Sequence, residues 1–419
     1  MNGDPGSGAT RCRRTQRWSA ALAAALLCLS PLTAQEKPSA KDDDEVSKLG
    51  PVDPYTGGDA AAMAAAGIVA YGPFPWADGH GTPDIDRVLG ERRVLWVETA
   101  HFRIGFSMKS APWPEAAAAK KQLQEEVKAL RKKLPKVAEK PKKLDPWLRL
   151  HLYAQRCEQA YAQFHALIGT TDADFPAKGT RPGEGAYLGM PGKFLVLLFQ
   201  KQSDMGRYMD RFCNMKADSS MRFYHDKTHS MLLAVAAEGL DGFDESGLHG
   251  HFLYALWHNL MNGLNGFRFP LPHWFAEGIA HCQARKVESD FLNIQIRDDE
   301  AVAEEKQNNW PVKVRRRAQH DGTWFPFETM VQWTDWKELG YHAHSQSWSR
   351  LDYLLQLDRE KVGAMLRKLK NVPADGTFDG QAAQLRTLAQ RLLFETFEFD
   401  AATFDQKWRE WVLKTYPKK

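Results

Sequence analysis

Two neighbouring segments, residues 249–262 and 273–285, constrain the fold of this 419-residue chain more than any other feature. In the first segment, apolar residues recur with helical spacing on one side, which predicts a half-buried amphipathic helix that Gly263 can end. A turn with two prolines follows, and a second helix is expected after it. A helix–turn–helix of this kind brings His258 close to Glu277. This pair is therefore the first candidate for a functional site.

The order of the expected elements along the chain indicates an α+β fold. Short apolar runs typical of buried strands come early, and long helical segments dominate the second half. Asp145 is the expected N-cap of one long helix. Strands are expected at residues 94–99, 101–106, 194–199 and 231–236, and helices outside the two opening segments at 113–134, 145–168, 203–212, 341–357, 359–370, 380–396 and 402–413.

The first residues have the composition of a secretory signal. Four arginines precede an apolar run from Ala20 to Leu29, and Ala34 then offers a small residue before a cleavage site, which predicts a secreted or periplasmic protein of the cell envelope. A lipid anchor at Cys28 is the less favoured alternative, because the bulky Leu27 precedes it. No later segment is apolar enough to span a membrane. The expected organisation is a signal peptide (1–34), a disordered linker (35–50), an irregular N-terminal extension packed on the main domain (51–93), the site-bearing part of that domain (94–285) and its helical C-terminal part (286–419).

Charge and cysteine content exclude several classes of protein. The formal charge is +4, but the first 34 residues carry four Arg and one Asp, which leaves +1 for the rest. No basic stripe remains for a nucleic-acid partner. Beyond the signal, Cys157, Cys213 and Cys282 form no C-x-x-C pair, so at most one disulfide is expected.

The residues after His258 match only part of a zinc-site pattern. In H-E-x-x-H, two His one helical turn apart bind zinc and the Glu activates the bound water. Asn259 stands at the position of that Glu, and Asn262 at the position of the second His. None of the fourteen His in the chain is followed by Glu, so the missing motif does not occur elsewhere.

Several segments in order carry a resemblance to a known family. They are Glu98–Phe102, Phe194–Phe199, Ala255–His258, Pro272–Gly278 and Tyr341–Leu355. From about Trp96 to Tyr416, the chain resembles the peptidase MA-like gluzincins, zincin-fold proteins secreted by bacteria and often left as domains of unknown function. The resemblance implies a small mixed sheet with a metal helix and a Glu helix packed against it, and a helical C-terminal part.

The resemblance implies zinc ligands at His258 and Glu277, with Asn262 at the third ligand position and Asn259 at the general base. An amide cannot accept a proton from zinc-bound water at neutral pH, and it is a weak zinc ligand. A rewired site would recruit His281, which shares a helix face with Glu277, or else His251. Zinc is the cofactor that such a site would take.

Other polar residues have simpler interpretations. Tyr341 is a candidate oxyanion residue, with packing at a helix start as the favoured alternative. The pairs His249/His251 and His342/His344 alternate along helices, so joint metal binding by either pair is not expected. His225 and His229 are expected in a polar loop.

Three functions remain open. The first is an inactive peptidase whose cleft binds a peptide, a protein or another envelope component by strand addition along residues 231–236. The second is a divergent zinc metallohydrolase that uses His258, Glu277 and His281. The third is a structural or assembly module. The missing base favours the first, and the oligomeric state is left open.

Overall fold

The computed structural model describes residues 45–90, 93–176, 184–217, 219–240, 244–267, 271–289, 309–334, 338–370 and 378–419. All of them belong to one unit, residues 40–419. The expected signal peptide lies outside the described residues, as does most of the expected linker. The end of that linker is ordered, because the short helix η1 (Val46–Lys48) buries Val46. The Glu45 carboxylate accepts hydrogen bonds from the backbone and hydroxyl of Ser110.

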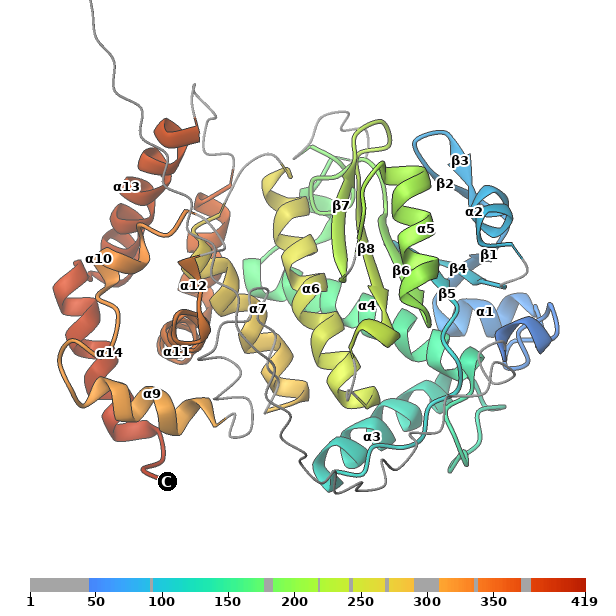
Figure 1. Cartoon of the computed structure of the whole chain (residues 1–419), viewed down its shortest axis with the longest axis horizontal. Coiled ribbons are helices and arrows are strands. Elements are labelled where there is room, and N and C mark those ends of the chain that lie inside the picture. Colours follow the sequence, from blue (N-terminus) through green and yellow to red (C-terminus); the bar gives the residue numbers. More distant parts are fainter. Residues whose placement is uncertain are drawn as a thin grey trace, which may run out of the picture. The chain divides into compact units, whose positions relative to one another are not determined.

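A six-stranded mixed sheet, in the order β1-β4-β5-β6-β8-β7, organises the first half of the chain (Figure 1). β5, β6 and β8 run parallel, and β1, β4 and β7 pair antiparallel with their neighbours. The expected α+β class is confirmed. The strands are β1 (Ile68–Tyr71), β4 (Leu95–Thr99), β5 (Phe102–Phe106), β6 (Phe194–Phe199), β7 (Met221–His225) and β8 (Ser230–Ala236).

The free edge of the sheet differs from the expected one. The run at residues 231–236 was expected to be an edge strand, but β8 is hydrogen-bonded to β6 on one side and to β7 on the other. All seven of its residues are buried, which agrees with an interior strand covered on both faces. β7 is the terminal strand on this side of the sheet instead, and β1 is the terminal strand on the other side.

Helices cover both faces of the sheet because the central strands are apolar on both sides. Phe194, Val196 and Leu198 of β6 share a hydrophobic core with α4 (Pro146–Ile168) and α6 (Glu245–Asn265). The alternate residues Leu195 and Leu197 belong to a second core, with α2 (Thr82–Leu89) and α5 (Gln202–Cys213). The Asp145 side chain accepts a hydrogen bond from the Leu148 backbone at the start of α4, as its predicted N-cap role requires.

The N-terminal extension, residues 51–93, is more regular than expected. It contains α1 (Ala60–Ala66), the two-stranded sheet of β2 (Pro75–Ala77) and β3 (His80–Gly81), and α2. It also supplies β1, which pairs with β4 at the edge of the main sheet. These elements are too short to show a periodic pattern among the prolines and glycines, and they are stabilised by contacts with the rest of the chain.

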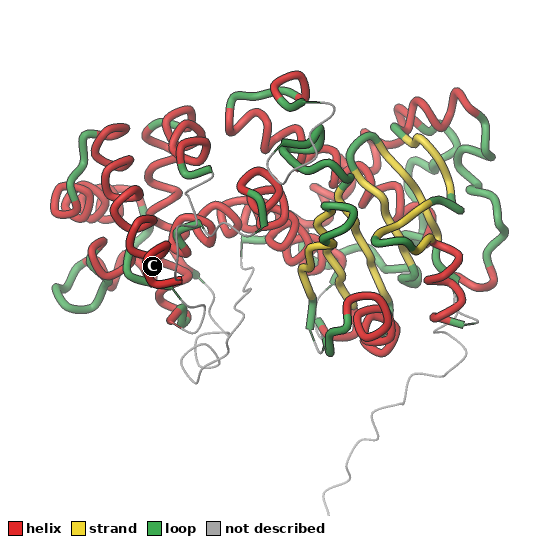
Figure 2. The backbone as a smooth tube through the Cα atoms, turned by 90° about the horizontal axis from the view of Figure 1, so that it is seen from above, coloured by secondary structure: helices red, strands yellow, loops and turns green. Residues whose placement is uncertain are grey.

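The second half of the described chain is helical. α6 and α7 (His273–Val287) form the expected helix–turn–helix, and α7 packs against α11 (Tyr341–Leu357). Figure 2 shows this helical region beside the sheet. The four expected C-terminal helices are present, while α9 and the short α10 were not expected. The further helices are α9 (Trp310–Ala318), α10 (Phe327–Met330), α12 (Arg359–Lys368), α13 (Phe378–Phe397) and α14 (Ala401–Thr415).

Gly263 does not end α6. The helix continues to Asn265, and Gly266 follows it with a positive φ of 74°. A Cβ atom at Gly263 would lie 2.8 Å from Cζ of Phe194 on β6. The glycine therefore allows the helix to approach the sheet closely.

Candidate metal centre

Three helices bring a glutamate and three histidines together in the interior. α7 carries Glu277 and His281 one turn apart on one face, α11 contributes His344 and α6 contributes His258. All four side chains are buried, with exposed fractions of 2% or less. Ionisable groups buried to this degree are rare unless they pair with one another or bind a metal.

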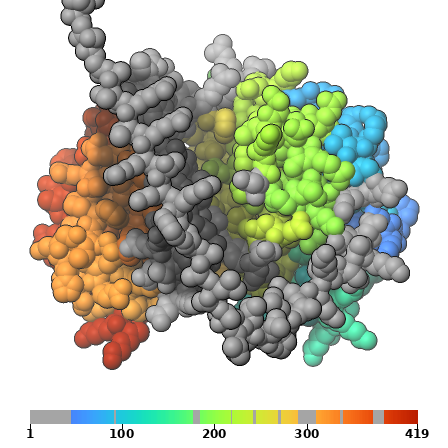
Figure 3. Space-filling view, in the orientation of Figure 1, coloured from blue at the N-terminus to red at the C-terminus, as the bar shows by residue number. Residues whose placement is uncertain are grey.

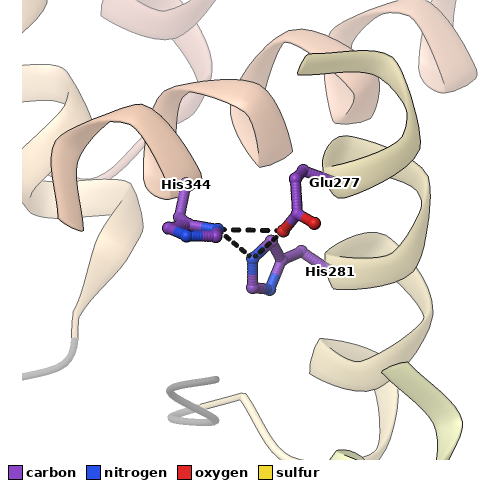
Figure 4. A group of neighbouring side chains, drawn as sticks. All are labelled: Glu277, His281 and His344. Atoms are coloured by element: carbon purple, nitrogen blue, oxygen red, sulfur yellow. Dashed lines mark hydrogen bonds and ion pairs between the residues drawn. The ribbon is translucent and has the colours of Figure 1, made fainter. Parts of the chain in front are cut away.

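Three atoms in this group face one another (Figure 4). Oε2 of Glu277 lies 2.9 Å from Nδ1 of His344 and 3.3 Å from Nε2 of His281. The two imidazole nitrogens are 3.0 Å apart. Each residue thus offers one ligand atom to a common point, and Glu277, His281 and His344 could hold a metal ion.

His258 and Tyr254 contact the same carboxylate from α6. Nε2 of His258 lies 3.1 Å from Oε1 of Glu277. The Tyr254 hydroxyl donates across both carboxylate oxygens, at 2.9 and 2.8 Å. Glu277 is therefore surrounded by one phenol and three imidazoles, and His258 lies beside the three-residue group without belonging to it.

The protonation states suit metal binding. Burial raises the pKa of Glu277, but His258, His344 and the hydrogen bonds to the carboxylate outweigh it, so the pKa lies well below its usual range. Burial lowers the pKa of His281 to about 4, although Glu277 opposes this. Burial and the positive charge of Arg222 on β7 lower the pKa of His258. At neutral pH, an ionised carboxylate therefore faces an uncharged His281, and uncharged imidazole is the metal-binding form.

The structure brings together some of the expected site residues and separates others. His258 and His281 both contact Glu277, but through different carboxylate oxygens, and His258 is not part of the metal group found among the described residues. His251 does not join them, because its Nε2 hydrogen-bonds to Oγ of Ser220 at 2.8 Å, just before β7. Asn262 is half-buried and is not part of the metal group found in the described part of the chain.

Asn259 and Tyr341 lie in the protein interior. Asn259 is only 1% exposed, and its Oδ1 has no hydrogen-bond partner within the described ranges. Tyr341 is fully buried at the start of α11, with its ring edge-on to Trp310 at 6.2 Å. This contact is the one expected of a residue that packs at a helix start.

His344 was missed as a site residue. The alternation of His342 and His344 correctly argued against a joint site of those two residues, but it said nothing about partners on another helix. One signal was available: residues 341–349 carry no charged side chain, which indicates that this part of the helix is buried. A histidine in such a segment needs a polar partner from elsewhere in the fold.

Two other sequence expectations are settled here. His225 does not lie in a polar loop: it is the last residue of β7, fully buried, and its Nδ1 lies 3.0 Å from Asp78. Cys157, Cys213 and Cys282 are all buried free thiols, so the single disulfide that the sequence allowed does not form among them.

Comparisons with protein-family models, with curated proteins and with solved structures found no match for this chain. Within the described ranges, no helix is long and apolar enough to cross a membrane. The function must therefore be argued from the site itself.

Proposed function

We propose that this protein is a zincin-like protein without hydrolytic activity, which binds an extended polypeptide along the free edge of its sheet. The observation that carries the proposal is the environment of Glu277. This carboxylate is fully buried and already contacts Tyr254, His258, His281 and His344. It is therefore not placed to activate a water molecule, and the general-base position holds Asn259, an amide.

The zincin-like assignment rests on the arrangement of the site elements. A mixed sheet ends in the antiparallel strand β7, and α6 packs on the neighbouring strand β8. The next helix, α7, then supplies Glu277. This order of a sheet followed by two helices is similar to the sheet, metal helix and Glu helix that the resemblance implies, and this similarity supports the assignment.

The polypeptide-binding part of the proposal concerns β7. Among the described strands, β7 pairs only with β8, so the backbone groups along its other side have no strand partner among the described residues and are the ones that strand addition would use. Met221, Arg222 and Phe223 are half-buried, and the surface around residues 219–240 is in view in Figure 3. The hydrogen bond from His251 to Ser220 places α6 beside the start of this strand.

A second candidate, a divergent zinc hydrolase, is favoured by the donor set alone. Two His and one Glu are a ligand set of catalytic zinc sites. Catalysis also needs an open coordination position for water and a base to activate it. Burial of the whole group argues against access of water to the metal, and the amide at Asn259 cannot serve as the base.

To test the proposal, the full chain is incubated with a broad peptide library. The matched control is Glu277→Gln, because the Gln side chain has nearly the same volume as Glu. We expect no cleavage above that control. We expect binding peptides to slow hydrogen exchange of backbone amides in residues 221–225, because strand addition gives those amides a new acceptor. Glu277-dependent cleavage would show that the protein is a hydrolase. Slower hydrogen exchange confined to another element would refute peptide binding along β7. Absence of any binding peptide would favour the structural-module interpretation.

A further inference from the structure

We infer that Glu277, His281 and His344 supply three ligands of a buried structural site for a zinc ion that links α7 to α11. His258 stands at the family's ligand position, but in this ligand set His344 takes part instead. The inference goes beyond polypeptide binding at β7 and does not depend on it.

The spacing of the three atoms fits a metal centre. Zinc binds imidazole nitrogen and carboxylate oxygen at about 2.0–2.2 Å, so two of its ligands in a tetrahedron lie ~3.3 Å apart. The three separations here are 2.9, 3.0 and 3.3 Å. One face of a coordination tetrahedron is therefore assembled with little further movement.

Without a metal ion, protons hold the same three atoms together only by crowding two donors around one oxygen or by leaving two lone pairs face to face. The carboxylate oxygen only accepts hydrogen bonds, and each uncharged imidazole carries one N–H. If both facing nitrogens of His281 and His344 are protonated, both can donate to Oε2 of Glu277, but the two N–H groups then lie side by side with their nitrogens only 3.0 Å apart. If only one is protonated, the lone pair of the other faces the Glu277 oxygen at 2.9 or 3.3 Å. A divalent cation between them would accept all three lone pairs.

Zinc binding through Nε2 of His281 has one cost. It leaves the proton of this imidazole on Nδ1, which has no hydrogen-bond partner among the described residues. The His281 ring lies edge-on to the Trp310 ring, with 4.9 Å between the ring centroids. The metal-free tautomer protonated on Nδ1 has the same cost. Nδ1 of His281 therefore does not distinguish the zinc-bound protein from the metal-free one.

The donor chemistry selects the metal class. Two imidazoles and a carboxylate suit zinc and similar first-row divalent ions, whereas calcium and magnesium require oxygen ligands. One negative carboxylate offsets half of the charge of a divalent ion, and Tyr254 supplies a hydrogen bond to the same carboxylate at 2.8 Å. Such support from a neighbouring side chain orients a ligand.

The location makes the site structural. Glu277, His281 and His344 are each 1% exposed or less. α7 and α11 already approach closely here, since a Cβ at Gly278 would lie 2.6 Å from the backbone oxygen of Ser347. A shared metal ion would hold the two helices in this register and stabilise the folded state by mass action.

The test uses the untagged full chain, dialysed against zinc and then freed of excess ion. We expect about one zinc per chain by elemental analysis, a lower melting temperature after chelation, and a visible absorption band typical of tetrahedral coordination when cobalt(II) replaces zinc. His344→Gln should weaken zinc binding by roughly 10²-fold or more, as loss of a ligand must exceed the 10–100-fold effect of losing an outer partner. His258→Gln is the comparison variant: it removes an imidazole that contacts Glu277 but is not a ligand, so it should weaken zinc binding less than His344→Gln does.

Absence of zinc and of the cobalt band in the folded wild-type protein would overturn the inference, as would loss of zinc in His258→Gln with retention in His344→Gln. Circular dichroism of both variants distinguishes ligand loss from unfolding. The wild-type measurements need no variant, so the inference remains testable if a variant does not fold. Peptide binding at β7 with no zinc would refute this inference alone, and zinc without peptide binding would refute only the proposed function.

Discussion

Gly278→Ala tests whether the close approach of α7 and α11 assembles the cluster. Glycine within a helix normally costs stability, so its presence between Glu277 and His281 needs a reason. A Cβ at this position would lie 2.6 Å from the backbone oxygen of Ser347 and 2.6 Å from Cγ of Leu351. The backbone oxygen cannot rotate away, so the substitution forces α7 and α11 apart.

The magnitude follows from two opposing effects. Forcing a methyl group into a well-packed interface costs about 1–3 kcal/mol, and the overlap with a backbone atom favours the upper end of that range. Replacing a helical glycine by alanine returns about 1 kcal/mol. The net expectation is a loss of ~2 kcal/mol, which corresponds to roughly a 30-fold change in the folding equilibrium.

The assay compares unfolding in urea and zinc content for Gly278→Ala and for Gly206→Ala in α5. At Gly206 the nearest atom to an added Cβ is 3.9 Å away, an ordinary contact. We expect Gly206→Ala to stabilise the protein by up to ~1 kcal/mol and to leave zinc unchanged. Gly278→Ala should destabilise it and weaken zinc binding. The reasoning is refuted if Gly278→Ala is as stable as the wild-type protein and binds zinc equally well.

Three further predictions address the alignment, the pH dependence and the fold. In a His344→Gln background, Asn259→Glu with Asn262→His should restore zinc binding, because it adds an imidazole one turn from His258; continued absence of zinc would contradict the family alignment. Burial lowers the pKa of His80 to about 4 from 6.5, so the unfolded chain binds more protons between these values. Stability should therefore fall as pH drops from about 6.5 towards 4, and His80→Gln should reduce that slope in pH-dependent urea unfolding. Asp145→Ala should cost about 1 kcal/mol through loss of the N-cap of α4, measured by urea unfolding; a cost near zero would contradict the capping role.

Local patterns predicted the long and apolar elements well. β6 is a continuous apolar run and α4 begins after a capping Asp145, so each has a signal within its own residues. β7 has a mixed composition, Met-Arg-Phe-Tyr-His, and forms because β8 offers it a hydrogen-bonding partner. β1 likewise depends on β4. The edge strand was misplaced because pairing, unlike apolar character, is not local.

Gly263 shows the same limit at a single residue. The expectation that Gly263 ends the helix was reasonable, since glycine commonly follows the last turn of a helix. Its role here comes from Phe194 on β6, which leaves no space for a side chain at this point of α6. The sequence contains the glycine, but the reason for it lies in a strand far away in the chain.

By itself, the sequence determined that Glu277 and His281 share a helix face and that an amide, Asn259, follows His258. Helix geometry is local, so spacing alone places side chains one turn apart. Only the tertiary structure decided that His344 completes the group while His251 turns to Ser220. His344 lies on a helix whose position depends on how α11 packs against α7 around Gly278. Such packing is set by contacts between distant residues, which no local spacing encodes.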